Sequence, residues 1–474
     1  MMNKNEEFEV LITDMSDEGA GIGKYAGFTW FVKDAVIGDK VLAGVTKQKK
    51  NYGFARLIKV IEPSKDRVEA ACPISRQCGG CQLQSLSYAA QLNFKENKVL
   101  NNLSRLGGFD LDSMQKEGLE ILSILGMEEP YRYRNKAQFP IGTDRDGNIA
   151  AGFYAGRTHS IIPCTDCILG CKENTQILEV ILDHMKINNI ASYDEKNGTG
   201  VLRHVLIRKG HTSKEIMVCL IINADKYPKL NELTERLLEL NFTDGSHIAS
   251  ISCSINKEKT NVIMGTKIRN VYGPGYIEDS ISCSDGKSLI FRISPLSFYQ
   301  VNPVQMEKLY KTALDFAGLS GNENVWDLYC GIGTISLFLA QKAKKVYGVE
   351  IIPQAIENAR DNAKRNEIEN AEFFVGKAED VLPDWYKKNP DEKIDVIVVD
   401  PPRKGCDEEC LKTMAEMAPD RIVYVSCDSA TLARDLKYLC ANGYNLKKVR
   451  ACDMFPQTVQ VETVVLLSSK KLTV

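Results

Sequence analysis

The pattern of residues 325–350 constrains the fold of this chain more than any other stretch. A strand-like apolar run passes into a turn with Gly331 and Gly333, and helical periodicity follows over residues 335–342. A second apolar run ends at Glu350, nineteen residues after Gly331. This order is typical of a βαβ unit, in which the glycines let the backbone approach a ligand and the carboxylate accepts hydrogen bonds from ribose hydroxyls.

The glycine turn also narrows the class of ligand. It lacks the full Gly-x-Gly-x-x-Gly set, which disfavours a dinucleotide with a pyrophosphate. The succession Asp327-x-x-Cys-Gly-x-Gly-Thr, followed by Gly-Val-Glu350, resembles instead a turn that binds S-adenosylmethionine. A chain of 474 residues is long enough for two to four domains, so this unit accounts for only part of it.

Three further positions in the C-terminal half carry groups suited to chemistry. An apolar run over residues 394–399 predicts a central strand that ends at Asp400. Cys427 follows another short apolar strand, at the end where open α/β sheets place their chemistry. Glu462 lies inside the apolar stretch 458–467, where a carboxylate is costly unless it faces a cavity or a partner.

Cys427 also lies beside a predicted helix start. Ser426, Asp428 and Ser429 offer N-cap oxygens, and residues 431–438 have helical periodicity. The field at a helix N-terminus lowers the pKa of a thiol, so the sequence predicts a reactive thiolate. The alternative is a buried cysteine that acts as a small hydrophobic side chain.

Cysteines gather in two groups that are suited to a metal. Cys72-x5-Cys78-x2-Cys81 places three thiols within ten residues. The second group consists of Cys164, Cys167 and Cys171. Four thiolates hold zinc or an iron–sulfur cluster, and the lack of paired Cys-x2-Cys knuckles favours iron–sulfur. The total of fifteen cysteines is odd, which argues against a secreted disulfide framework and fits a reducing cytoplasm.

The N-terminal residues predict a small antiparallel barrel of the oligonucleotide-binding kind. We expect the glycine-rich residues 19–23 to form a hairpin turn, because no parallel strand precedes them and no Gly-Lys-Ser/Thr ending follows. The predicted strands cover residues 8–12, 29–32, 41–45 and 54–61.

Nucleic-acid binding has to come from local patches, since the net charge of the chain is −2. Residues 47–59 contain five bases, no acid, and the aromatic residues Tyr52 and Phe54, which is the chemistry of single-strand binding. A solvated hairpin is the alternative. Residues 131–136 and 202–208 also mix bases with aromatic or apolar side chains, and either stretch lines an RNA groove or forms a half-exposed strand.

The motifs together resemble those of the RNA uracil-5 methyltransferases, and within them the ribosomal-RNA branch with an N-terminal TRAM barrel. The resemblance covers nearly the whole chain. Its carriers, besides the barrel, are Cys72-x5-Cys78-x2-Cys81, Phe298-Tyr-Gln-Val-Asn302, Asp327-Leu-Tyr-Cys-Gly331, Gly348-Val-Glu350, Asp400-Pro-Pro-Arg-Lys-Gly405, Ser426-Cys-Asp428 and Val461-Glu-Thr-Val464.

The resemblance implies an α/β chain of three parts. Residues 1–62 would form the RNA-binding TRAM barrel, and residues 63–290 a central α+β iron–sulfur and RNA-binding region, whose helix 88–106 packs on the catalytic domain. Residues 291–474 would form a Rossmann-like, S-adenosylmethionine-dependent methyltransferase domain. The implied enzyme is cytoplasmic and monomeric and has no membrane partner, in keeping with a polar N-terminus and no run of membrane-spanning length.

The resemblance also implies roles for individual residues. Cys427 would be the nucleophile and Glu462 the general base in methylation of C5 of a specific uridine in 23S ribosomal RNA. The cofactor would contact Gln300, Tyr329, Glu350 and Asp400. A 4Fe–4S cluster would be held by Cys72, Cys78, Cys81 and Cys167, with Cys164 and Cys171 as competing fourth ligands.

Three other functions remain to be separated from this one. Transfer-RNA members of the family typically lack the barrel and the cysteine cluster, which favours ribosomal RNA. In cytosine-5 methyltransferases the nucleophile usually follows a proline, whereas Cys427 follows Ser426. A non-enzymatic RNA-binding protein with a decayed catalytic domain is disfavoured by the intact Cys427, Glu350 and Glu462. One departure from the family pattern is Gln460, where His is common, and neither catalytic role falls on it.

Overall fold

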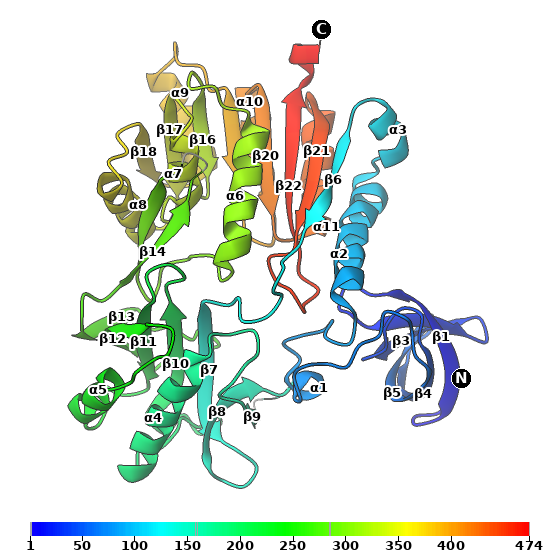
Figure 1. The fold of residues 1–474 in the computed structure, drawn as a ribbon. Helices are drawn as coiled ribbons and strands as arrows, with labels where there is room; N and C mark the ends of the chain where they lie inside the picture. The colour runs from blue at the N-terminus through cyan, green and yellow to red at the C-terminus, as the bar shows by residue number, and fades with distance from the viewer. Residues whose placement is uncertain (1, 157, 159, 284–285, 474) are drawn as a thin grey trace.

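The computed structural model describes residues 2–156, 158, 160–283 and 286–473. The chain forms a closed barrel, a seven-stranded sheet, a two-stranded hairpin and an eight-stranded sheet. In Figure 1 the barrel and the seven-stranded sheet lie side by side below the eight-stranded sheet. No helix in this described part of the chain is long and apolar enough to cross a membrane.

The N-terminal barrel closes in the strand order β1-β2-β3-β5-β4. Its core forms around Trp30, which is 1% exposed and whose ring centroid lies 4.7 Å from that of Phe8. Gly53 faces this indole, and a Cβ there would lie 2.2 Å from Trp30 Cζ3. The strands are β1 (Glu7–Met15), β2 (Gly21–Tyr25), β3 (Phe28–Lys33), β4 (Lys40–Gln48) and β5 (Tyr52–Glu62).

The predicted turn at residues 19–23 is partly strand. Gly19 turns with a φ of +81°, but β2 already begins at Gly21. A Cβ at Gly23 would lie 2.5 Å from the carbonyl oxygen of Leu11 on the neighbouring β1. The last glycines of this stretch therefore allow two strands to approach closely, and the turn itself is shorter than predicted.

The central region is built on the seven-stranded sheet, in the order β13-β12-β11-β10-β7-β8-β9. Ile177 of α4 and Leu233 of α5 are fully buried in the core on one face. Leu206 and Met217 face the other way, into a core shared with the eight-stranded sheet and its helices. The elements are β7 (Lys136–Thr143), β8 (Ile149–Tyr154), β9 (Ile161–Pro163), α4 (Glu173–Ile187), β10 (Leu202–Lys209), β11 (Glu215–Ile222), α5 (Leu230–Leu238), β12 (His247–Ile255) and β13 (Lys267–Tyr272).

The eight-stranded sheet has the order β18-β17-β16-β19-β20-β22-β21-β6. Neighbours from β18 to β20 pair in parallel, and β22 returns antiparallel to β20. The strands are β16 (Asn324–Leu328), β17 (Lys345–Glu350), β18 (Ala371–Val375), β19 (Val396–Val399), β20 (Arg421–Ser426), β21 (Tyr444–Cys452) and β22 (Glu462–Ser469). The helices are α6 (Pro303–Ala317), α7 (Thr334–Ala340), α8 (Pro353–Arg365), α9 (Ala378–Lys388), α10 (Glu408–Met417), α11 (Ser429–Ala441) and the terminal 3-10 helix (Lys470–Thr473).

The eighth strand of this sheet comes from far upstream. Residues 107–130 have the sequence of an irregular connection, but they contain α3 (Leu111–Lys116) and β6 (Glu120–Leu125). β6 pairs in parallel with β21 and forms the edge of the sheet. Most of its side chains are only half-buried, so its sequence lacks the apolar alternation that marks a strand.

The remaining elements connect the three regions. Helix α2 (Tyr88–Asn102) continues into a π-helical turn (Leu103–Gly107), and Asn102 Nδ2 donates to Ser429 Oγ at the start of α11 over 2.8 Å. Thus α2 lies against the eight-stranded sheet and its helix α11, as Figure 1 also shows. The short helix α1 (Ser75–Cys78) precedes it, and the hairpin of β14 (Ile277–Ser282) and β15 (Ser288–Ile293) joins the two large sheets.

Candidate active site

A cleft of about 810 Å³ opens where the parallel strands of the eight-stranded sheet end. Four adjacent strands each deliver one predicted residue to it: Tyr329 follows β16, Glu350 ends β17, Asp400 follows β19 and Cys427 follows β20. The cleft is also lined by the two remaining predictions for this site, Gln300 and Glu462. The crossover connections of a parallel sheet bring these ends to one edge, so residues far apart in sequence share one cavity.

Cys427 is placed by the junction between β20 and α11. Asp428 caps the helix, and its side chain accepts hydrogen bonds from the backbone N–H groups of Ala430 (2.9 Å) and Thr431 (3.1 Å). Ser426 Oγ accepts from Asp428 N–H over 3.2 Å, which fixes the backbone on both sides of the cysteine. Cys427 is half-buried and lines the cleft. The predicted helix start is confirmed, with Asp428 as the cap.

Glu462 reaches the same end of the cleft through strand pairing. In the antiparallel register of β20 and β22, Ser426 pairs with Thr463. The next residue on each strand is therefore Cys427 on one side and Glu462 on the other, and the Glu462 charge acts on the thiol. Glu462 is the first residue of β22, so the strand begins later than the predicted apolar stretch 458–467. The carboxylate is 4% exposed and faces the cleft, which explains how it is tolerated beside apolar residues.

The ionisable groups of the cleft favour their neutral forms. Burial raises the pKa of Glu462 to about 8, the Asp400 carboxylate adds to the shift, and the Arg403 guanidinium opposes it. Burial also raises the pKa of Asp400 to about 7. The pKa of Cys427 is raised to about 12 by burial, then by Glu462 and Asp400. The predicted lowering of the thiol pKa is therefore wrong for the free protein, because burial and two carboxylates outweigh Arg403 and a backbone hydrogen bond.

The glycine turn forms the other end of the cleft. Tyr329 adopts a φ of +65°, and Gly331 follows with +56°. A Cβ at Gly331 would meet no atom within 4 Å, so the backbone there borders open space. On the next strand, Glu350 Oε1 accepts a hydrogen bond from Ile352 N–H over 3.1 Å, which orients the carboxylate beside the cavity.

Several lining residues were not found from the sequence. The Arg403 guanidinium opposes the rise in the pKa of both Cys427 and Glu462. In the sequence the only sign of this residue was its place in the Asp-Pro-Pro-Arg motif. Phe298 lines the cleft although it is 71% exposed, and Phe455 lines it from the segment between β21 and β22. No periodicity marks these positions, because the cleft brings together loops of different parts of the chain.

Five cysteines from the two predicted groups converge beside the central sheet. The charge of Cys167 acts on Cys78, Cys81 and Cys164, and that of Cys72 acts on Cys78 and Cys164. Burial raises the pKa of Cys81 to about 11 and that of Cys164 to about 12. The donor set is that of an iron–sulfur or zinc site, although within the described residues no three Cys, His, Asp or Glu side chains are arranged to hold a metal ion.

Cys171 is separate from these five. Its thiol donates to the carbonyl oxygen of Arg134 over 3.3 Å. Burial raises its pKa to about 11, and the charges that act on it are those of Lys209, Glu173, Asp244 and Arg132, not those of other cysteines. Of the three candidates for a fourth ligand, Cys164 and Cys167 thus lie near the first group.

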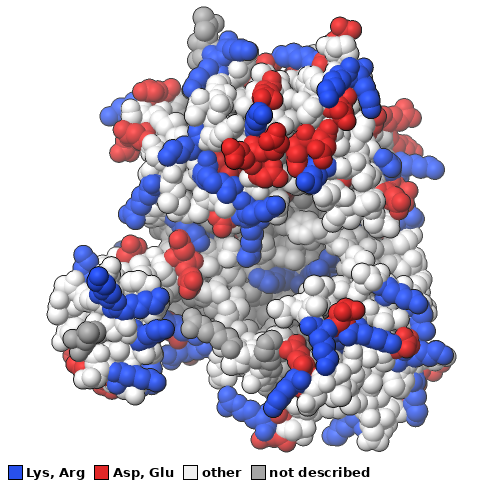
Figure 2. Space-filling model, turned by 180° about the vertical axis from the view of Figure 1, so that it is seen from behind, with Lys and Arg blue, Asp and Glu red and all other residues white. Residues whose placement is uncertain are grey.

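The basic stretch of the barrel is free to bind a partner. Its aromatic side chains form a cluster in which the ring centroids of Tyr52 and Phe54 lie 5.6 Å apart, and the Phe31 ring contacts both. Lys49 Nζ lies 5.1 Å from the centroid of the Tyr52 ring. The five exposed bases, none paired with a described acid, are Lys47, Lys49, Lys50, Arg56 and Lys59. Figure 2 shows lysine and arginine side chains on the barrel at its lower left.

The other two predicted RNA stretches are largely used inside the protein. Arg203 is 4% exposed and donates to the carbonyl oxygen of Asn256 over 2.9 Å, and Arg208 is 1% exposed. Both faces of β10 are covered, so the prediction that residues 202–208 line an RNA groove or form a half-exposed strand is wrong. In the stretch 131–136, the Tyr133 hydroxyl is buried and donates to the carbonyl oxygen of Pro456 over 3.0 Å.

Comparisons with known proteins agree with this site. Residues 252–470 match the family model described as tRNA (Uracil-5-)-methyltransferase, and residues 3–58 match the TRAM domain. A protein of Halalkalibacterium halodurans named as an RNA methyltransferase is 47% identical over 469 residues, 99% of this chain and 98% of the relative. The chain belongs to the RNA uracil-5 methyltransferase family. A Clostridium acetobutylicum RNA methyltransferase is 48% identical to this family member over 98% of each chain.

A solved member of the family has the same architecture throughout. The crystal structure of the Pyrococcus abyssi tRNA (uracil-54, C5)-methyltransferase in complex with S-adenosyl-L-homocysteine is 27% identical, with a TM-score of 0.75. It covers 97% of this methyltransferase and 100% of its own chain. An enzyme named for transfer RNA therefore shares the whole fold, barrel included. The expectation that transfer-RNA members lack a barrel no longer separates the two classes of RNA substrate.

Proposed function

We propose that this methyltransferase transfers a methyl group from S-adenosylmethionine to C5 of a specific uridine in 23S ribosomal RNA. The observation that carries the chemical part of the proposal is the single cleft that holds Cys427, Glu462 and the four proposed cofactor residues. A nucleophile and a base at one end, beside a cofactor turn at the other, are what uracil C5 methylation requires.

Cys427 begins the proposed reaction. Uracil C5 is too weak a nucleophile to accept a methyl group directly, so the thiolate adds to C6 and the C5–C6 double bond becomes an enolate. The nearby Arg403 favours the thiolate, against the effects of burial and the carboxylates. The target base has to leave its stack to reach the half-buried thiol.

Glu462 completes the reaction. When bound, S-adenosylmethionine supplies the methyl group that C5 accepts, together with a positive sulfonium charge that favours ionised groups nearby. The carboxylate of Glu462 then takes the C5 proton, the electrons of that C–H bond restore the C5–C6 double bond, and the thiolate leaves C6. A base with a pKa of about 8 is close to the range that suits proton transfer at neutral pH.

The cofactor is proposed to contact Gln300, Tyr329, Glu350 and Asp400. Glu350 would accept hydrogen bonds from the ribose hydroxyls, because it ends the second strand after the glycine turn. The open space over Gly331 suits the approach of the ligand to the backbone. Beside it, the exposed side chains of Ile351 and Ile352 (57% and 56%) offer an apolar surface to a nucleobase.

We further propose that Cys72, Cys78, Cys81 and Cys167 hold a 4Fe–4S cluster. The thiols gather from two segments, and Cys167 acts electrostatically on both Cys78 and Cys81, which supports it over Cys171 as fourth ligand. Cys164 is the remaining competitor. Iron and acid-labile sulfide in protein purified without oxygen would support the proposal, and stoichiometric zinc without sulfide would reject it.

The proposed RNA contacts lie mainly on the barrel, residues 1–62, while residues 63–290 hold the cluster and residues 291–474 the chemistry. Exposed lysine and arginine side chains around Tyr52 and Phe54 suit a single RNA strand, whose nucleobases would stack on the aromatic rings. We also propose that the enzyme acts in the cytoplasm as a monomer. Light scattering of the purified protein with and without RNA tests the oligomeric state.

Transfer RNA is the second candidate substrate. It is favoured by one specific observation, the match over the whole chain to a transfer-RNA uracil methyltransferase. Unmodified ribosomal RNA and unmodified transfer RNA, incubated in parallel with labelled S-adenosylmethionine, would separate the two. Label in a uridine of 23S ribosomal RNA alone supports the first proposal, and label in transfer RNA alone replaces it while leaving the roles of Cys427 and Glu462 intact.

A further inference from the structure

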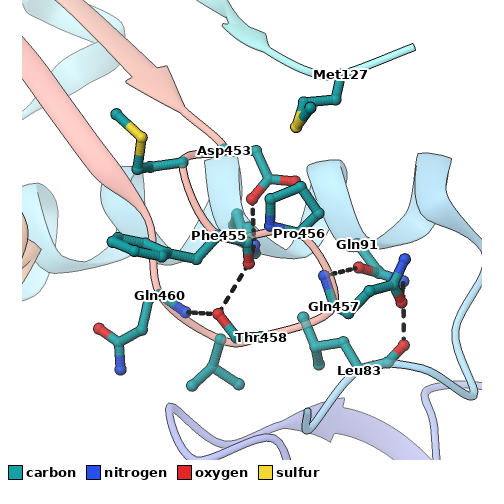
Figure 3. A network of polar contacts seen from close by, with 12 residues as sticks. Leu83, Gln91, Met127, Asp453, Phe455, Pro456, Gln457, Thr458 and Gln460 are labelled. Carbon is teal, nitrogen blue, oxygen red and sulfur yellow. Dashed lines mark hydrogen bonds and ion pairs between the residues drawn. The ribbon is translucent and has the colours of Figure 1, made fainter. Parts of the chain in front are cut away.

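The segment 453–461, which we call the base loop, connects β21 to Glu462 at the start of β22. It carries Phe455 and Gln460 into the lining of the cleft. Figure 3 shows this loop with its polar contacts. Because the loop has no helix or strand of its own, the position of Glu462 depends on what holds these residues.

Donors from outside the loop hold most of its backbone carbonyl groups. Six donors do so, and four of them lie upstream of the methyltransferase domain (residues 291–474). These four come from the segment before α2, from α2 itself and from the segment before β7. The donors are Gln305 Nε2 to Asp453 (3.1 Å), Asn302 Nδ2 to Met454 (3.0 Å), Lys95 Nζ to Phe455 (3.0 Å), the Tyr133 hydroxyl to Pro456 (3.0 Å), Leu83 N–H to Gln457 (3.0 Å) and Lys98 Nζ to Val459 (3.3 Å).

A buried ion pair fixes the first residue of the base loop. Lys95 Nζ pairs with Asp453, and both side chains are completely buried. The Tyr88 hydroxyl donates to the other carboxylate oxygen of Asp453 over 2.9 Å. A charge this far from water is retained only with a close partner, so Lys95 and Asp453 hold α2 and the loop in one relative position.

A pair of glutamines fixes the middle of the base loop. Gln457 N–H donates to Gln91 Oε1 over 3.0 Å, and Gln91 Nε2 donates back to Gln457 Oε1 over 3.0 Å. Gln91 also donates to the carbonyl oxygen of Leu83 over 3.1 Å, as Figure 3 shows. Gln457 has a φ of +70°, a left-handed conformation that costs a non-glycine residue free energy and persists only when its surroundings hold it.

We propose that Gln91 and Lys95 of α2 are positioning residues for Glu462, which they hold in place through the base loop. The inference rests on the proposed function, because it assigns the pair to the step that Glu462 performs. Cys427 is placed separately, by the Ser426 and Asp428 contacts between β20 and α11. Loosening the base loop is therefore expected to slow removal of the C5 proton and to leave addition of the thiolate unchanged.

Gln91→Met tests this with little change of volume in a buried position. It removes both hydrogen bonds to Gln457, together with those to the carbonyl oxygens of Leu83 and Leu86, and leaves the charge of the region unaltered. We expect the covalent complex of enzyme and methylated RNA to resolve about tenfold more slowly or worse, since small misplacements of a catalytic group have effects up to ~100-fold. The rate of adduct formation and the KM for S-adenosylmethionine are expected to stay as in the wild type. Both rates are measured by quenched-flow and denaturing gels, with the RNA that the parallel labelling assay identifies.

Two further variants decide the outcome. Asn97→Ala removes an exposed amide from the same helix and is expected to resolve the adduct at the wild-type rate. Tyr133→Phe removes only the hydroxyl that holds Pro456 and should slow resolution to a lesser degree, which keeps the test available if Gln91→Met does not fold. The proposal would be overturned if Gln91→Met and Tyr133→Phe, where they fold, resolved the covalent adduct at the wild-type rate and showed only a lower melting temperature. Failure of the wild type and of Glu462→Gln to form any adduct would instead refute the proposed function itself.

Discussion

Replacing Glu462 by Gln should make the stability of the free protein less dependent on pH. The carboxyl has a pKa of about 8 in the folded protein, against 4.5 for an unburied glutamate. The folded state thus binds this proton more tightly than the unfolded state does. Its stabilising effect is complete below about pH 4.5 and is lost as pH rises through about 8. The difference corresponds to about 5 kcal/mol, since one pKa unit is worth about 1.4 kcal/mol.

Urea unfolding at pH 5 and pH 9 measures this effect without any ligand. Trp326 and Trp385 lie in the catalytic core and report its unfolding by fluorescence. The free energy of unfolding of the wild type should fall between pH 5 and pH 9 by several kcal/mol more than that of Glu462→Gln. Asp400, whose pKa is raised to about 7, titrates in the same direction and remains in both proteins. An equal fall in wild type and variant would show that Glu462 is not held neutral by burial, and would refute this account of the cleft.

Three further predictions concern the barrel and the cysteines. Neutralising Lys47, Lys49 and Lys50 together should weaken RNA binding and flatten its dependence on salt, measured by filter binding from low to high salt, and an unchanged slope would mean that these bases are merely solvated. Cys78→Ser should lose iron and sulfide and much of the yield of folded protein, because the remaining thiols lack an organising metal, whereas full iron content would remove Cys78 from the ligand set. Gly53→Ala should overpack Trp30 and lower the free energy of unfolding of the barrel by about 1–3 kcal/mol, seen as a lower melting temperature. Cofactor affinity, measured by calorimetry, should be unchanged. A wild-type melting curve would contradict the packing around Gly53.

The sequence was sufficient for the catalytic half because its signals are local. Parallel strands with continuous apolar runs, such as β19 and β20, carry their functional residues directly at their ends, so Asp400 and Cys427 could be placed at one edge before the structure was known. Glu462 could be suspected because a carboxylate in an apolar strand requires a cavity. Its position beside Cys427 followed only from the antiparallel register of β20 and β22.

The features that could not be predicted from the sequence depend on contacts between distant segments. Arg203 and Arg208 have the composition of an RNA-binding strand, but β10 is covered on both faces by elements that no local pattern reveals. The raised pKa of Cys427 likewise depends on Glu462 and Asp400, which the fold brings to it. Gln91, on α2, shows only helical periodicity in sequence, and its role toward the base loop became visible from the hydrogen bonds it makes.

The most direct test of the account is to trap the covalent intermediate. Glu462→Gln, incubated with substrate RNA and labelled S-adenosylmethionine, is expected to transfer one methyl group and to remain attached to the RNA through Cys427, because the C5 proton cannot leave. Intact-mass analysis and peptide mapping would locate the bond. Cys427→Ala is expected to bind RNA and cofactor without forming the adduct or methylated product. Methyl transfer by Cys427→Ala at the wild-type rate, or an adduct at another residue, would contradict the proposed mechanism.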